Sequence, residues 1–188
     1  KRQAIGNALE ETLTWTFRTP APVVDRFSPS NHQPQPRDPL FFVSFDQLID
    51  PEAVLETIRV SASGEQFETE LISAEDAREE AEGEDATQQS KQLQRMSDGA
   101  KEERWLAFRT TGLLPENTTV TVDIGPGTPS AEGPLTTEQV QSYSFQTYAP
   151  LRILQHSCGY GGECTPLAPF QIVFNNPLTE SVFERDMI

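Results

Sequence analysis

The sequence has few of the residues that usually carry chemistry. Its 188 residues include two cysteines and two histidines, His32 and His156. Neither histidine has a cysteine or a second histidine at the spacing of metal ligands, so we expect no metal site. No nucleophile elbow, phosphate-binding loop or dinucleotide-binding motif is present. We therefore expect no catalytic residue and no cofactor, and we predict that the chain is not an enzyme.

Basic residues and long apolar runs are also scarce. There are 14 Lys and Arg against 29 Asp and Glu, which gives a formal net charge of −15. Binding to nucleic acid needs clusters of basic side chains that pair with phosphates, and no such cluster occurs. No apolar run approaches the roughly 18 residues that a membrane-spanning helix needs. We expect neither a nucleic-acid partner nor direct membrane insertion of this segment.

What the sequence does contain is an internal repeat. Trp15–Val23 aligns with Tyr143–Leu151 at an offset of 128, and Phe41–Asp46 aligns with Phe170–Asn175 at an offset of 129. A third match places a glycine and a leucine upstream of each repeat: Gly6 and Leu9 before Phe17, and Gly133 and Leu135 before Phe145. Repeats at a fixed distance indicate repeated modules. We expect a piece of a longer protein with three parts: the C-terminal strand or strands of a preceding module (1–20), a complete module (21–149) and the N-terminal part of a following module (150–188).

Apolar residues alternate with polar ones in many short stretches. Phe41, Val43 and Phe45 place three side chains on one face, as a half-buried strand requires. Pro- and Gly-containing turns separate these stretches, which favours an all-β, antiparallel β-sandwich of immunoglobulin-like type. The predicted core consists of the apolar residues of these strands: Phe17, Phe41, Val43, Phe45, Trp105, Phe108, Val120, Val122, Tyr143, Phe145, Ile172 and Phe174.

Two stretches do not follow the strand pattern. Residues 20–39 hold six prolines, which favour an extended or polyproline lead-in between modules. Residues 73–104 hold ten acidic and five basic residues and are rich in Ala, Glu and Gln, which favour helix. We expect a charged helical insertion there, with Leu93, Met96 and Ala100 as its short apolar stripe; the alternative is a solvated charged loop.

The two cysteines flank a glycine-rich turn, Cys158-Gly-Tyr-Gly-Gly-Glu-Cys164. A loop of this length and flexibility allows the two thiols to meet, so we predict a disulfide. Disulfides persist in oxidising compartments, such as the periplasm or the cell surface. The alternative is a pair of free thiols.

Four segments suggest a family: Trp105–Arg109, Gly125–Leu135, Tyr143–Tyr148 and Phe174–Leu178. They resemble the N-terminal, macroglobulin-like modules of bacterial alpha-2-macroglobulins. The resemblance implies tandem macroglobulin-type sandwiches within a broad-spectrum endopeptidase inhibitor that traps proteases at the cell envelope, in the periplasm or outside the cell.

On that resemblance, the partners are neighbouring modules of the same parent and, through the parent, its target proteases. The thioester motif C-x-E-Q of many such inhibitors is absent, because Thr-Pro-Leu follows Cys164 and Gly-Tyr-Gly follows Cys158. We therefore expect these modules to act as a non-catalytic scaffold. The alternative is that they are immunoglobulin-like spacer or adhesion modules of a bacterial surface protein.

Overall fold

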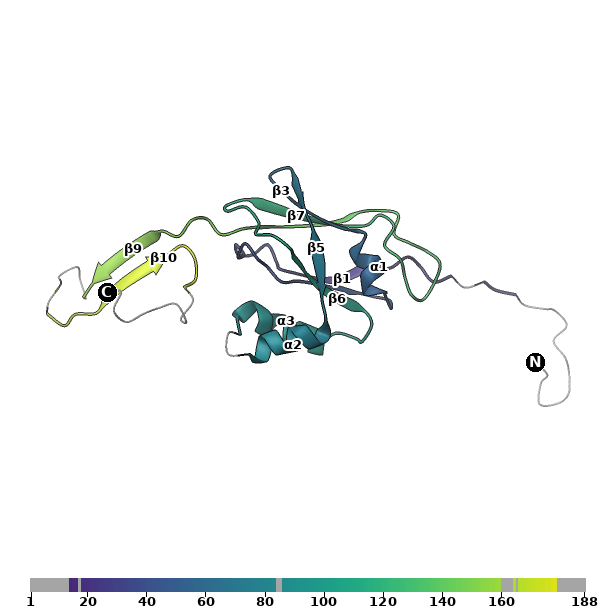
Figure 1. Cartoon of the computed structure of the whole chain (residues 1–188), viewed down its shortest axis with the longest axis horizontal. Coiled ribbons are helices and arrows are strands. Elements are labelled where there is room, and N and C mark those ends of the chain that lie inside the picture. Colours follow the sequence, from purple (N-terminus) through teal and green to yellow (C-terminus); the bar gives the residue numbers. More distant parts are fainter. Residues whose placement is uncertain (1–13, 17, 84–85, 160–163, 165, 179–188) are drawn as a thin grey trace.

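Alternating apolar residues build two four-stranded antiparallel sheets that pack face to face as a β-sandwich (Figure 1). This computed structural model describes residues 14–16, 18–83, 86–159, 164 and 166–178. The first sheet has the strand order β1-β2-β6-β5, and the second has the order β4-β3-β7-β8. The strands are β1 (Val24–Ser28), β2 (Phe41–Phe45), β3 (Ile58–Ala62), β4 (Glu65–Phe67), β5 (Thr69–Ile72), β6 (Trp105–Thr110), β7 (Thr119–Ile124) and β8 (Gln141–Gln146).

The main core lies between the two sheets. Phe41 and Phe108 are fully buried there, and their rings stack with centroids 4.6 Å apart. Val120 and Val122 of the second sheet face them, and Phe145 closes the core from β8. Burial of this apolar surface is the main favourable contribution to folding. The remaining buried residues of this core are Val43, Phe45, Ile49, Val54, Ile58, Val60, Ala62, Leu106, Leu114 and Ile124.

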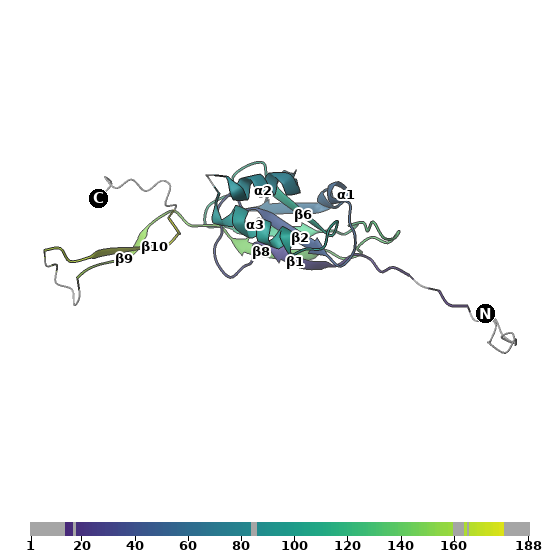
Figure 2. The same ribbon diagram turned by 90° about the horizontal axis from the view of Figure 1, so that it is seen from below.

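Strand β2 is buried on both faces, because helices cover the outer face of the first sheet. Helices α2 (Ala74–Glu82) and α3 (Gln88–Asp98) lie within residues 73–104 and pack over β2 and β6 (Figure 2). Their buried residues Ala77 and Leu93 contact a second core that includes Phe42 and Ala107. The side-chain oxygens of Ser73 and Thr87 cap the two helices, each accepting a bond from a backbone N–H three residues on.

Four of the predicted core residues lie elsewhere. Trp105 is half-buried on the helix-covered face, 5.6 Å from Phe42 between ring centroids, because strand alternation places Leu106 and Phe108 in the inner core instead. Tyr143 is half-buried at the margin of the core. Ile172 is 39 % exposed and Phe174 is half-buried, because both lie in a two-stranded hairpin over which the described residues place no second layer. Phe17 lies outside the described residues.

Part of the proline-rich lead-in belongs to the sandwich itself. The proline-rich lead-in contains β1, an edge strand that pairs with β2, and its Phe27 stacks on Tyr143 at 4.3 Å between ring centroids. Proline is tolerated around an edge strand because one side of that strand needs no ladder bond. Phe67 and Leu71 lie on different strands, because the chain leaves one sheet at Glu68: β4 joins the second sheet and β5 joins the first.

Candidate functional site: the β9–β10 hairpin and the module boundary

After β8 the chain forms a separate two-stranded antiparallel sheet from β9 (Ile153–Cys158) and β10 (Phe170–Phe174). Figure 1 shows this hairpin beyond one end of the sandwich. The disulfide predicted from the sequence is present at its tip, between Cys158 and Cys164, with their Cα atoms 5.2 Å apart. The bridge joins the end of β9 to the segment that leads into β10.

The pairing of β9 with β10 repeats the pairing of β1 with β2, residue by residue at an offset of 129. In the sandwich, Val24 pairs with Phe45, and in the hairpin Ile153 pairs with Phe174. The register then shifts by one residue at the same place in both pairs. Further along, Phe27 pairs with Val43, and His156 pairs with Ile172. The matching irregularity is strong support for a structural repeat, because bulges are specific features of a strand pair.

The rings that pack on these strands repeat as well. Phe27 lies 6.4 Å from Phe41 between ring centroids, and His156 lies 6.3 Å from Phe170. The imidazole of His156 thus has the position in the hairpin that the half-buried phenyl ring of Phe27 has in the sandwich.

Side-chain bonds at the start of each strand pair repeat at the same offset. The backbone N–H of Val23 donates to Oδ1 of Asp46 over 2.8 Å, and the N–H of Arg152 donates to Oδ1 of Asn175 over 2.7 Å. In return, the backbone N–H of Asp46 donates to the carbonyl oxygen of Val23, and that of Asn175 donates to the carbonyl oxygen of Arg152. The chain therefore enters both strand pairs by the same path.

One further residue holds the connection that precedes each strand pair. Nε2 of Gln47 donates to the carbonyl oxygens of Pro20 and Ala21, over 3.0 and 3.2 Å. Nδ2 of Asn176 donates to the carbonyl oxygen of Ala149 over 2.7 Å. These bonds, which we call the amide clamps, hold the carbonyl oxygens of Pro20 and Ala21 in the sandwich and of Ala149 before the hairpin. The two clamp residues could have been found by extending the sequence repeat two positions past the end of β10.

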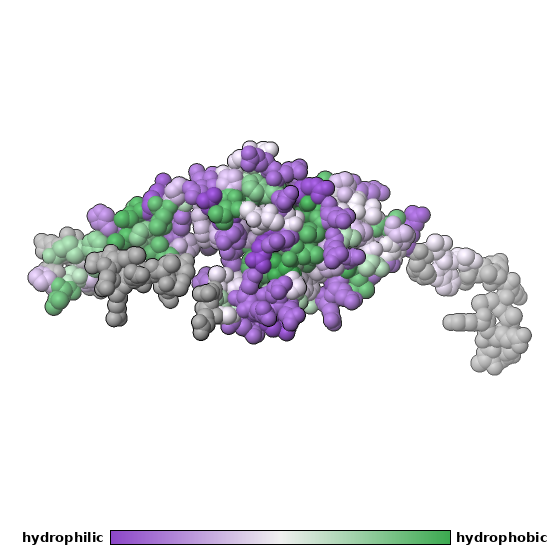
Figure 3. Space-filling view, viewed as in Figure 1, coloured by the Kyte–Doolittle hydropathy of each residue, from purple (hydrophilic) through white to green (hydrophobic). Residues whose placement is uncertain are grey.

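The hairpin exposes apolar side chains whose counterparts in the sandwich are buried. Phe170 is 60 % exposed and Ile172 is 39 % exposed, whereas Phe41 and Val43 are fully buried. On β9, Ile153 is 55 % exposed. Figure 3 shows apolar surface gathered over this hairpin and hydrophilic surface over the helices. Within the described residues, no strand pairs with the second edge of β10.

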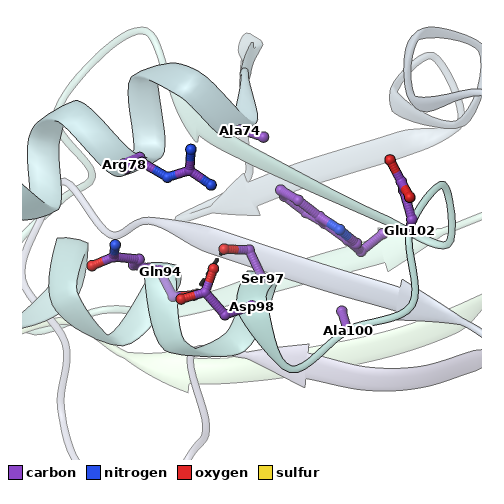
Figure 4. Close-up of a pocket in the computed structure, with 8 residues that line it drawn as sticks. Ala74, Arg78, Gln94, Ser97, Asp98, Ala100 and Glu102 are labelled. Atoms are coloured by element: carbon purple, nitrogen blue, oxygen red, sulfur yellow. Dashed lines mark hydrogen bonds between the residues drawn. The ribbon is translucent and has the colours of Figure 1, made fainter.

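A recess lies between the two helices and the start of β6, with a volume of about 180 Å³ (Figure 4). The side chain of Trp105 forms part of its wall, and Arg78, Asp98 and Glu102 stand at its rim. These charged groups are exposed to solvent. Sequence reasoning missed this recess because it forms only where the helices dock on the sheet.

Two tyrosines next to the module boundary have shifted pKa values. Burial raises the pKa of the Tyr143 and Tyr148 phenols above the usual value of 10.0. In the described part of the chain, no three His, Cys, Asp or Glu side chains gather where they could hold a metal ion. Of the helices described, none has the length and apolar character to cross a membrane.

Comparison with known proteins does not assign a family. No family model matches the sequence, and no curated protein matches it. Among solved structures, the N-terminal part of the bacterial S-layer protein SbsC is 10 % identical, with a TM-score of 0.39, covering 74 % of this chain and 26 % of that one. The LD transpeptidase LdtMt1 in complex with imipenem is 15 % identical, with a TM-score of 0.40, covering 78 % and 58 %.

This chain therefore spans about a quarter of the SbsC structure and somewhat over half of the LdtMt1 structure. Neither of them is an alpha-2-macroglobulin.

Proposed function

We propose that the chain is a non-catalytic scaffold segment made of tandem β-sandwich modules. The observation that carries the proposal is the residue-by-residue match between the β9–β10 hairpin and the β1–β2 strand pair, bulge and amide clamps included. A strand pair that begins one sandwich recurs directly after that sandwich ends. Repetition of whole modules along one chain is typical of proteins that span distance or build walls.

The module boundary supports a role in transmitting position from one module to the next. The strand β8 leads into residues 147–150, where Thr147 is buried and its hydroxyl donates to the carbonyl oxygen of Pro115 over 2.6 Å. The backbone of Tyr148 bonds Gln35 and Asn117. The connection to β9 is thus held by the sandwich on one side and by the clamp of Asn176 on the other. A connection held at both ends limits rotation between modules, which suits a scaffold.

We propose further that the parent is an alpha-2-macroglobulin-like inhibitor of endopeptidases at the cell envelope. The strand and turn segments that resemble that family support this, and the Cys158–Cys164 disulfide fits an oxidising compartment, the periplasm or the cell exterior. The partners of this segment would be neighbouring modules of the same parent, and target proteases would be bound by the parent as a whole.

An immunoblot of cells that naturally make the protein tests the proposal, with an antibody raised against these 188 residues and envelope, cytoplasmic and culture fractions run side by side. The inhibitor requires a band several times the 21.0 kDa of this chain, in the envelope or culture fraction. Added endopeptidases of different specificity should cut it to a few discrete pieces while the protease stays bound. Protease pre-treated with an active-site inhibitor is the control and should leave the band intact.

Other outcomes have definite meanings. A large surface-exposed band that binds no protease would identify spacer or adhesion modules and remove the inhibitor. A band near 21.0 kDa, or one confined to the cytoplasm, would overturn both the tandem scaffold and the inhibitor.

A further inference from the structure

We propose that the open edge of β10 is a strand-acceptor site, which takes up an antiparallel strand that is the counterpart of β6 in a second sandwich. This inference rests on the proposed tandem modules and names the partner of their exposed hairpin. The occupant of the equivalent edge is visible in the first sandwich, where β6 pairs antiparallel with β2 over four residue pairs, Phe41–Phe108 to Ser44–Trp105.

Backbone geometry shows that the acceptor edge of β10 is formed by alternate residues. In the first sandwich the N–H of Phe45 donates to the carbonyl of Arg104, toward β6, while the N–H of Asp46 donates to Val23, toward β1. The N–H of Asn175 donates to Arg152 in the same sense as Asp46. Because N–H groups alternate along an antiparallel strand, those of Phe170 and Ile172 face the open edge, and those of Gln171 and Val173 face β9.

The side chains of β10 define the chemistry of the strand that fits. Phe170 and Ile172 correspond to Phe41 and Val43, whose partners on β6 are Phe108 and Leu106. The incoming strand therefore needs large apolar residues opposite Phe170 and Ile172. Gln171 replaces the fully buried Phe42, which the helices cover in the first sandwich. The outer face of the hairpin is thus polar at Gln171, and the incoming strand needs no apolar residue opposite it.

The apolar area left exposed gives the driving force. Phe170, Ile172 and Ile153 lie on one strand pair and are 60 %, 39 % and 55 % exposed. A two-stranded ribbon alone is marginally stable in water, and a third strand with an apolar face stabilises it. An edge with unpaired N–H and C=O groups is a ready template for such a strand.

The proposal can be tested by giving the chain a second copy of its own β6. Residues 104–111 are appended after Ile188 through a flexible Gly/Ser linker of about ten residues, which keeps the strand at a local concentration in the millimolar range. Amide hydrogen exchange is then followed by NMR. The amides of Phe170 and Ile172 should exchange roughly tenfold or more slowly than in the unextended chain, because they gain ladder bonds. The amides of Gln171 and Val173 should be protected in both chains.

Matched variants distinguish pairing from non-specific contact. In the extended chain, Ile172→Asp should abolish the new protection at Phe170, whereas Gln171→Asp on the same strand should leave it. Placing Leu106→Asp and Phe108→Asp in the appended copy alone should also abolish it.

Three results would overturn the proposal, and they are distinguishable. Unchanged exchange at Phe170 and Ile172, with Gln171 protected, would mean that the hairpin forms but accepts no strand; the tandem scaffold would survive this result. Rapid exchange at Gln171 and Val173 would mean that the hairpin itself does not form, which would remove the scaffold proposal as well. Protection of Ile172 that rises with concentration in the unextended chain, with dimers in sedimentation, would assign the edge to a second copy.

Discussion

Arg109 of β6 joins helix α2 to the sheet through Glu80: its Nη2 lies 2.7 Å from Oε1 of that carboxylate. Its Nε also lies 3.4 Å from Oε1 of Glu70 on β5. A single guanidinium thus links two strands and the helical layer. This contact explains part of how an insertion rich in charge stays on a sheet whose outer face is largely apolar.

Replacing Glu80 by Gln should lower the free energy of unfolding modestly. Both side chains are more than a third exposed to solvent, so the loss should be about 0.5–1 kcal/mol after screening. The measurement is urea unfolding at low and high salt, and the difference from the parent chain should shrink at high salt. Glu79→Gln, on an exposed neighbour, is the control and should change little. An equal loss for both variants would show that the ion pair is not the cause.

Leu93→Ala should loosen the helical layer while leaving the sandwich folded. Leu93 is 3 % exposed and anchors α3 on Phe42 and Ala107, so the local cost should be about 2–5 kcal/mol. Amide exchange should speed up in α2 and α3 and stay slow in β3 and β7. Lys91→Ala on the exposed side of α3 is the matched control. Equal acceleration in the helices and the sandwich would show that the layers unfold as one unit.

Phe145→Ala should destabilise the whole sandwich. Its side chain is 3 % exposed and lies 5.9 Å from Phe41 between ring centroids, so its loss should cost about 3–5 kcal/mol. Denaturant melts followed by circular dichroism measure this. Leu151→Ala, at a residue that is 57 % exposed, is the control. A loss below about 1 kcal/mol for Phe145→Ala would contradict its place in the inner core.

The stability of the sandwich should fall at alkaline pH. Burial raises the pKa of the Tyr143 and Tyr148 phenols above 10.0, because desolvation disfavours the phenolate. The stabilisation from the neutral phenols is fully present below the unfolded pKa and is lost as pH rises through the folded pKa. Urea melts from about pH 9 to about pH 11 should show this decline, and the Tyr143→Phe, Tyr148→Phe double variant should flatten it. An unchanged slope would assign the decline to other groups.

Much of the inner core can be predicted from alternation, but its register depends on what covers each face. Phe41, Val43 and Phe45 were placed correctly because a polar residue stands at Ser44 and the period is clear. In the run Trp105-Leu-Ala-Phe108 every residue is apolar, so alternation alone does not show which ones face inward. Only the docked helices reveal that Trp105 lies on the outer face.

The candidate site, too, could be predicted only in part from the sequence. The repeat in the sequence already aligned Phe41 with Phe170 and set residues 150–188 apart as part of a following module. It also placed Ile172 and Phe174 in a core, which requires a second layer that the described residues do not contain. Extending the repeat by one residue beyond Asn175 aligns Gln47 with Asn176, but the hydrogen bonds of the amide clamps run to distant carbonyl oxygens, and alternation of apolar residues does not indicate such bonds.

Gln47→Leu should weaken the entry into the module without disrupting the core. Gln47 is 5 % exposed; its amide nitrogen donates to Pro20 and Ala21, and the hydroxyl of Ser130 donates to its amide oxygen over 2.7 Å. Pro20 is exposed and Ala21 and Ser130 are half-buried, so losing their hydrogen bonds to the Gln47 amide should cost about 1 kcal/mol. Because the clamp holds residues 20–21 against the sandwich, limited proteolysis should cut near them faster, while β3 and β7 keep their slow amide exchange. Gln66→Leu on the exposed strand β4 is the control for added apolar surface. If Gln47→Leu changed neither the cleavage rate nor the stability, the clamp would not hold the boundary, and the equivalent bond from Asn176 would lose its role in joining the next module.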